Sequence, residues 1–160
     1  MGLKSNFFIL IVLFVMISCD KKQVFDQYEK VGKSWHKNQS VLFEFDPIDT
    51  IKPYDLFLNI RNNKNYPFSN LFLIVEMEQP DKNTLVDTLE YVMANPDGTL
   101  LGKGFSDVKE SKLYYKENYI FKNSGVHRIK IQHAMRQTGK ISGVETLDGV
   151  MEVGFRVESK

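Results

Sequence analysis

The sequence predicts an all-β fold in which a single jelly-roll-like β-sandwich follows an N-terminal signal segment. Apolar and polar residues alternate in several short segments, and this period of two places successive side chains on opposite faces of a strand. The 160 residues include 12 Phe and 7 Tyr, and aromatic residues favour strands. Gly, Asn and Pro separate these segments at short intervals, which is typical of a sandwich of roughly eight strands.

The N-terminal 20 residues have the features of an export signal. Lys4 supplies a positive charge, residues 7–17 are uninterruptedly apolar, and Ser18 places a small residue directly before Cys19. As a helix this run would reach only ~16 Å, about half of the ~30 Å hydrocarbon core, so it is too short to span a bilayer. We therefore expect residues 1–18 to be removed as a signal peptide.

Cys19 is the only cysteine, so it has no disulfide partner within the chain. Its position resembles a bacterial lipobox, in which the cysteine receives a diacylglycerol on sulfur, becomes the new N-terminus and is usually acylated again. Met16 departs from the leucine usual in that motif, and an ordinary secretory signal with a chance cysteine is the alternative. Two or three acyl chains would anchor the protein firmly, since each buried methylene contributes about 0.8 kcal/mol.

The mature chain divides into a short tether and one domain. Residues 19–23 are expected to link the lipid to a domain of residues 24–160, and the tether reaches at most ~14 Å when extended. Lys21 and Lys22, rather than acidic residues, follow Asp20. We therefore expect an outer-membrane protein that faces the periplasm. The aspartate directly after the cysteine keeps retention at the inner membrane as an alternative.

The charge balance argues against nucleic acid as a partner. The chain has 21 Lys and Arg against 20 Asp and Glu, and removal of residues 1–18 takes away one lysine and leaves the two signs equal. A domain of about 140 residues buries roughly two-thirds of its unfolded surface and needs neither a metal nor disulfides to fold. We expect no cofactor other than the covalent lipid on Cys19, and no small-molecule substrate.

The first part of the domain gives a mixed signal. Residues 24–31 fit either a short helix or an irregular strand. Residues 32–40 are polar except for Trp35 and indicate a loop. Residues 41–45 then predict a strand, which Asp and Pro end.

The next two segments predict strands of different kinds. Residues 71–75 form a continuous apolar run, short enough for a central strand buried on both faces. Residues 55–62 alternate and predict a half-buried strand. Its inner face has Leu56, Leu58 and Ile60, and its outer face has Asn59 and Arg61.

Residues 84–93 are ambiguous, because their apolar positions also fit a helical stripe. The β-branched content and the turn sequence at 95–98 favour a strand in a hairpin, with Leu100 and Leu101 beginning the return strand.

Three further strands are expected towards the C-terminus. Residues 109–119 mix Lys, Glu and Tyr, as an edge strand protected by charge does. Residues 126–133 and 150–157 alternate clearly. Their inward positions are Ile129, Ile131, Val153, Phe155 and Val157.

The chain has no recognisable catalytic or metal-binding constellation. Ser106 lacks the second glycine of a nucleophile elbow, and residues 102–104 indicate a bend rather than a phosphate loop. His127 and His133 lie ~20 Å apart on one strand, too far for one metal ion, so we expect ordinary hydrogen bonds there. Asp46, Asp49 and Asp55 are interpreted as turn residues.

The segment with some binding character is residues 61–68, where Asn and Arg are mixed with aromatic residues. Such a mixture suits a protein partner or a sugar. The candidate partner-binding residues are Arg61, Asn63, Tyr66 and Phe68. The alternative interpretation is an Asn-rich turn in which Tyr66 and Phe68 cover the edge of the core.

A carbohydrate-binding module of the cell envelope is the competing function class, because β-sandwiches often bind sugars. It requires an exposed aromatic platform. Trp35, Tyr66, Tyr114 and Tyr115 are the candidates.

Several segments together resemble the family of the gliding-motility lipoprotein GldH, and the similarity extends over nearly the whole chain. Besides the lipobox with Cys19, the segments that carry the resemblance are residues 53–57, 69–73, 87–91, 102–107, 133–136 and 153–158.

The resemblance implies a membrane-anchored lipoprotein required for gliding over surfaces. It further implies that the partners are proteins of the gliding and type IX secretion machinery, which the family helps to assemble or stabilise. It implies no enzymatic activity, and Cys19 is the one functional residue that it transfers to this chain.

Overall fold

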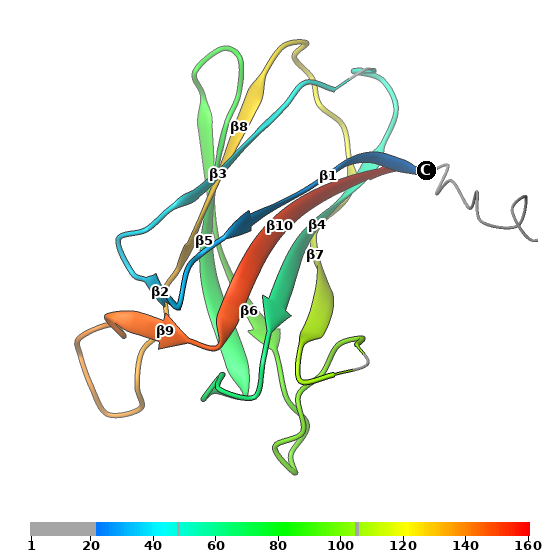
Figure 1. Cartoon of the computed structure of the whole chain (residues 1–160). Helices are drawn as coiled ribbons and strands as arrows, with labels where there is room; N and C mark the ends of the chain where they lie inside the picture. Colours follow the sequence, from blue (N-terminus) through cyan, green and yellow to red (C-terminus); the bar gives the residue numbers. More distant parts are fainter. Residues whose placement is uncertain (1–21, 48, 105) are drawn as a thin grey trace, which may run out of the picture.

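A computed structural model describes residues 22–47, 49–104 and 106–160, and within them the chain forms two packed four-stranded antiparallel sheets (Figure 1). The predicted signal peptide and Cys19 lie outside the described residues. The all-β prediction is confirmed. The strands are β1 (Gln23–Lys30), β2 (Ser34–His36), β3 (Val41–Phe45), β4 (Tyr54–Asn62), β5 (Asn70–Glu78), β6 (Thr84–Val92), β7 (Lys109–Tyr119), β8 (His127–His133), β9 (Thr146–Asp148) and β10 (Val150–Ser159).

The strand order is that of a jelly roll. One sheet has the order β1-β10-β4-β7 and the other β3-β8-β5-β6, with β2 and β9 as a small separate pair. The eight long strands pair as nested hairpins, β5 with β6, β4 with β7, β3 with β8 and β1 with β10. A long antiparallel ribbon that folds over itself gives this pairing, so the jelly-roll-like prediction is confirmed.

The core lies between the two sheets and is filled by the inward side chains that alternation predicts. Leu58 and Phe155 from one sheet and Leu73 and Ile131 from the other are fully buried. Burying a large aliphatic or aromatic side chain contributes about 1.5–3 kcal/mol. The hydrophobic effect therefore fixes which face of each strand turns inward.

The structure tests four predictions about individual segments of the chain. The undecided residues 24–31 lie in β1 except for Val31, and residues 84–93 lie in the strand β6, rather than in a helix, except for Met93. The expected loop around Trp35 is wrong, because this residue lies in β2. The expected return strand is also wrong, since Leu100 makes only an isolated bridge with Ala94.

The two central strands differ from the prediction in burial. In β5 only alternate residues are buried, so the prediction of burial on both faces is wrong. In β4, by contrast, Phe57 and Asn59 on the outer face are also buried, at 3% and 2% exposure. Tyr114 on β7 lies over Phe57, and Tyr28 on β1 contacts Asn59.

The strand registers define two ends of the sandwich. Gln23 pairs with Glu158, and Tyr54 pairs with both Ser159 and Tyr119. We call this the N-terminal end, where β1 begins and where the β3–β4, β5–β6 and β7–β8 connections lie (Figure 1). The β4–β5 turn and the β8–β9 connection lie at the opposite end. Within the described residues, no helix is long and apolar enough to cross a membrane.

Candidate interaction surface

The turn at residues 61–68 joins β4 to β5 and is held by its own backbone. Asn63 N donates to Gly149 O at 2.8 Å, and Tyr66 N donates to Asn63 O at 3.0 Å. The Asn63 side chain accepts a hydrogen bond from Asn65 N at 2.9 Å, which is the Asx-turn geometry that asparagine favours. The exposed part of this turn is therefore a rigid polar loop.

Tyr66 belongs to the core rather than to the surface. It is 5% exposed, and its hydroxyl donates to Asn70 O at 2.6 Å. Burial raises its pKa well above the ordinary tyrosine value. Its ring packs edge-on against Phe68, with 6.1 Å between the centroids. Tyr66 therefore positions the half-buried Phe68 from beneath.

Phe68 lines an open groove of about 370 Å³ beside the turn. Pro67 and the segment 137–148 form the rest of its wall, with Lys140 and Glu145 among the polar residues. Such a groove offers one aromatic surface surrounded by polar groups, which suits a side chain of a protein partner.

Arg61 points away from this turn and is held on the outer face of the β1-β10-β4-β7 sheet. Its Nε lies 2.6 Å from Glu110 Oε2, and its Nη1 lies 2.6 Å from Glu152 Oε2. Its guanidinium carbon stacks 4.1 Å from the centroid of the Tyr28 ring. Hydrogen bonds to the two carboxylates raise the pKa of Arg61 further above its ordinary value. The structure therefore groups Asn63, Tyr66 and Phe68 but separates Arg61 from them.

The expected aromatic platform is not present as a unit. Trp35, Tyr66 and Tyr115 are 0%, 5% and 8% exposed, so the expectation that they are exposed is wrong. Trp35 packs edge-on against His133, and its Nε1 donates to Gln39 O at 2.9 Å. Tyr114 is 58% exposed and lies over Phe57, with 4.5 Å between the ring centroids.

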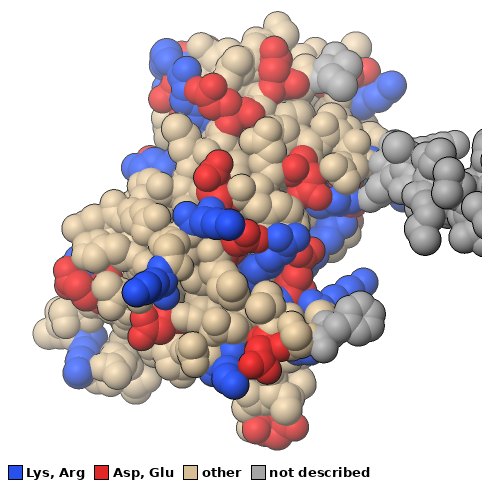
Figure 2. Space-filling view, viewed as in Figure 1, with Lys and Arg blue, Asp and Glu red and all other residues tan. Residues whose placement is uncertain are grey.

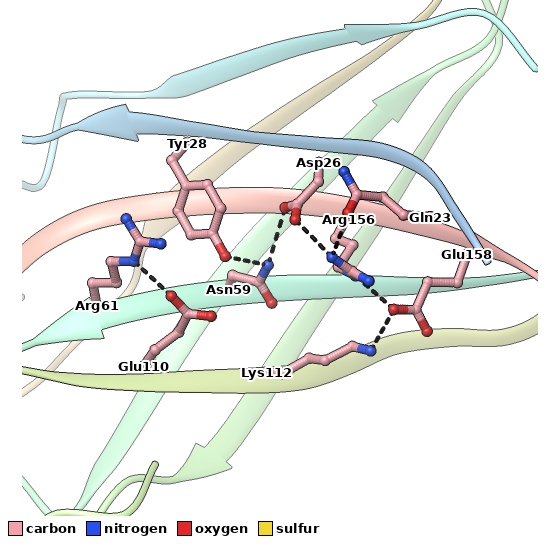
Figure 3. Close-up of polar contacts among 9 residues, drawn as sticks. All are labelled: Gln23, Asp26, Tyr28, Asn59, Arg61, Glu110, Lys112, Arg156 and Glu158. Carbon is pink, nitrogen blue, oxygen red and sulfur yellow. Dashed lines mark hydrogen bonds and ion pairs between the residues drawn. The ribbon is translucent and has the colours of Figure 1, made fainter. Parts of the chain in front are cut away.

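The outer face of the β1-β10-β4-β7 sheet carries a polar network that the sequence analysis missed (Figure 3). Arg156 lies at its centre, with Nη1 2.7 Å from Asp26 Oδ2 and Nε 2.5 Å from Glu158 Oε1. Lys112 Nζ lies 2.6 Å from the same Glu158 oxygen. Burial opposes ionisation of Glu158, but hydrogen bonds from Lys112 and Arg156 outweigh it and lower its pKa.

A second group in this network surrounds Asn59. Its amide donates to the Tyr28 hydroxyl at 2.8 Å, and Figure 3 shows it between the Tyr28 and Asp26 side chains. Burial, with the nearby Glu110 and Asp26 carboxylates, raises the pKa of Tyr28 to about 12. The alternating charged residues along β10 could have indicated this polar network from the sequence. Their partners on β1, β4 and β7, however, are far away in sequence.

Both signs of charge are interspersed on the face shown in Figure 2. On the outer face of the β1-β10-β4-β7 sheet, the network pairs Arg61 with Glu110 and Glu152, and Arg156 with Asp26 and Glu158. Interspersed charges of both signs do not produce a strong field of one sign over this face.

The two strand histidines, interpreted from the sequence as ordinary hydrogen-bonding residues, bond to backbone carbonyl groups within the fold. His127 Nδ1 lies 3.0 Å from Gly125 O, and His133 Nε2 lies 2.9 Å from Trp35 O. The expectation of ordinary histidine hydrogen bonds is confirmed. In the described part of the chain, no cluster of three or more His, Cys, Asp and Glu side chains could hold a metal ion.

Of the three aspartates interpreted as turn residues, Asp49 closes a local turn, whereas Asp46 binds the β7–β8 connection and Asp55 lies in β4, so the interpretation is wrong for Asp55. The expected bend lies at Gly102, which has φ +106°, and Lys103 beside it exchanges two backbone hydrogen bonds with Glu110 in an isolated antiparallel bridge. The carboxylates of Asp46, Asp49 and Asp55 accept hydrogen bonds from backbone N–H groups. Their donors are Gly125 for Asp46, Ile51 and Lys52 for Asp49, and Asn118 for Asp55.

Comparison with known proteins identifies close relatives. The profile of the GldH lipoprotein family matches residues 23–157. The chain is 54% identical over 160 residues to the gliding motility lipoprotein GldH of Flavobacterium johnsoniae. This alignment covers 100% of this chain and 99% of that protein. It is 52% identical over 159 residues to a GldH homolog of Christiangramia forsetii, with 98% of each chain covered.

Solved structures give only a loose likeness. The VP2 subviral particle of infectious bursal disease virus aligns with a TM-score of 0.36 and 12% identity, over 84% of this chain and 30% of that chain. The Gx strain of the same virus gives a TM-score of 0.40 and 11% identity, over 88% of this chain and 33% of that chain. A likeness of this size supports no inference about function.

Proposed function

This chain belongs to the GldH lipoprotein family, and on that basis we propose that it is a non-enzymatic lipoprotein required for gliding motility. Its role is to assemble or stabilise the gliding and type IX secretion machinery from the periplasmic side of the outer membrane. The observation that carries the proposal is the 54% identity, over the full length of both chains, to a gliding motility lipoprotein.

Lipid on Cys19 is the proposed means of attachment. The cysteine follows directly after an apolar run with a small residue at its end, as a lipobox requires. Tethering the domain at a membrane raises its effective concentration near membrane-bound partners, so a weak contact suffices for function.

The partner contact is proposed at the turn of residues 61–68. Asn63 supplies polar groups on a rigid loop, and Phe68 supplies aromatic surface beside the groove. Tyr66 supports this region from the core, whereas Arg61, held by Glu110 and Glu152 on the outer face of the sheet, lies outside the proposed contact.

Replacement of the lipidated residue tests the proposal. In cells that lack the native gene, C19A is expected to be lost from the detergent-soluble lipoprotein fraction and to abolish spreading, because the acyl chains are absent. Membrane fractionation, intact-protein mass spectrometry and colony spreading measure these effects.

The matched control is K21A, which changes a neighbouring residue and keeps the cysteine motif. It is expected to remain acylated and motile. Normal gliding by C19A, at the same cellular abundance as K21A, would show that the anchor is irrelevant to function.

A further inference from the structure

Exposed apolar side chains gather at the N-terminal end of the sandwich. Ile51 in the β3–β4 connection is 82% exposed, and Ile120 and Val126 in the β7–β8 connection are 44% and 43% exposed. Single exposed apolar residues are ordinary on a protein surface, whereas several in neighbouring loops call for a reason.

The two connections are joined to each other and supported from below. Gly125 N donates to Asp46 Oδ1 at 3.2 Å, which links the β7–β8 and β3–β4 connections directly. Beneath them, Phe121 is fully buried and packs against Tyr54 and Phe45, with ring centroids 5.7 and 5.3 Å away. The apolar side chains therefore project from a fixed aromatic base.

The charged groups around these side chains also suit a lipid headgroup region. Lys122 is exposed and has no ion pair with any residue that the structure describes, and the Lys52 side chain is 71% exposed with its Nζ 3.7 Å from Asp49 Oδ2. The carboxylates of Asp46 and Asp49 accept backbone hydrogen bonds within the loops. Lysines beside exposed apolar residues are the usual composition of a surface that rests on a membrane interface.

The length and position of the tether place this end near the bilayer. Four residue steps separate Cys19 from Gln23, a span of at most ~14 Å. Ser159 N donates to Lys22 O at 2.8 Å, and Ser159 pairs with Tyr54, three residues after Ile51. The chain therefore enters the domain beside the loop that carries Ile51.

We propose that the N-terminal end of the sandwich rests directly on the phospholipid bilayer, with Ile51 and Ile120 inserted at the interface and Lys52 and Lys122 among the headgroups. This proposal rests on the proposed lipid anchor at Cys19. It adds a fixed orientation, in which the turn of residues 61–68, at the opposite end, faces away from the membrane.

Site-specific labelling of the lipidated full-length protein tests the orientation. The lipid occupies the Cys19 sulfur, so I51C and the control I141C each introduce one free thiol for an environment-sensitive fluorophore. Ile141 is 95% exposed and lies in the β8–β9 connection at the opposite end. The labelled proteins are reconstituted into phosphatidylethanolamine and phosphatidylglycerol vesicles, with and without brominated acyl chains.

The I51C label is expected to lose roughly half of its fluorescence to brominated lipid, because interfacial side chains enter about 5–10 Å below the headgroups. The I141C label is expected to be unaffected, and I120C should behave like I51C. Protein that floats with the vesicles while both I51C and I120C remain unquenched, or are quenched no more than I141C, overturns the orientation alone. If the full-length protein purified from cells carries no acyl chains and does not float with the vesicles, the anchor and the orientation are overturned together.

Discussion

At the residue scale, Gly149 decides where the turn of residues 61–68 lies. It has φ +81°, a conformation that L side chains avoid, and a Cβ there would come 2.2 Å from Tyr66 N. The same glycine accepts the hydrogen bond from Asn63 N. Only a residue without a side chain lets the segment before β10 approach the turn this closely.

The matched pair G149A and G139A tests this close approach. Both glycines have positive φ, but a Cβ at Gly139 meets no atom within 4 Å. We expect G139A to destabilise by about 1 kcal/mol, from backbone strain alone. G149A is expected to cost about 3 kcal/mol, because overpacking adds to that strain.

Urea unfolding of the purified variants measures the difference. Equal losses for G149A and G139A would show that the contact between Gly149 and the turn has no energetic weight.

At the element scale, polar contacts join the four strands of one sheet on its outer face. Arg61 on β4 reaches Glu110 on β7 and Glu152 on β10, and it stacks on Tyr28 of β1. One side chain thus contacts residues on the three other strands of its sheet. Cross-strand pairs of opposite charge contribute modestly one by one, but a shared arginine couples them.

Removal of this arginine is expected to destabilise the sheet. R61A leaves two carboxylates close together without their shared cation and uncovers Tyr28, so we expect a loss of about 1–2 kcal/mol. The control K64A removes an ion pair with Asp107 whose side chains are 75% and 70% exposed. That pair is expected to contribute less than about 0.5 kcal/mol.

Thermal or urea unfolding at low and high salt compares the two variants. A loss for R61A no larger than that for K64A would contradict the coupling between strands.

The elements themselves were largely predictable. Alternation gave strands close to β3, β4, β8 and β10, because burial of one face imposes a period of two on the sequence. The polar residues 32–40 concealed the short β2, whose Trp35 is buried by its packing on His133 rather than by a local pattern.

At the scale of the whole molecule, two buried histidines connect stability to pH. Burial lowers the pKa of both His127 and His133, so the folded state binds fewer protons on these rings than the unfolded chain does at the same acidic pH. In the unfolded chain they take up protons near pH 6.5. The unfolded state therefore binds more protons below this pH, and the free energy of unfolding falls as the pH decreases from about 7.5 to 5.

The variant H133Q tests this dependence, since glutamine can still donate to Trp35 O, as Nε2 of the histidine can at 2.9 Å. We expect a smaller decrease in the free energy of unfolding between pH 7.5 and 5 than in the unaltered protein. Urea titrations at several pH values measure the slope. A slope unchanged in H133Q would mean that protonation of His133 does not contribute.

The candidate site was predictable only in part. The polar turn and the aromatic pair Tyr66 and Phe68 were visible in the sequence, as was the alternative that they cover the core edge. The sequence did not show that Arg61 lies apart from the turn, because its partners Glu110 and Glu152 are distant in sequence and meet it only through strand pairing.

The sequence by itself determined the family, the all-β class and the inward face of most strands, and it predicts the signal segment with Cys19, because these depend on composition, short motifs and a local period of two. Only the tertiary structure decided the nested strand order, the burial of Trp35 and Tyr115 and the network around Arg156. These depend on which strands become neighbours, and side chains that meet across a sheet leave no local pattern in either strand alone.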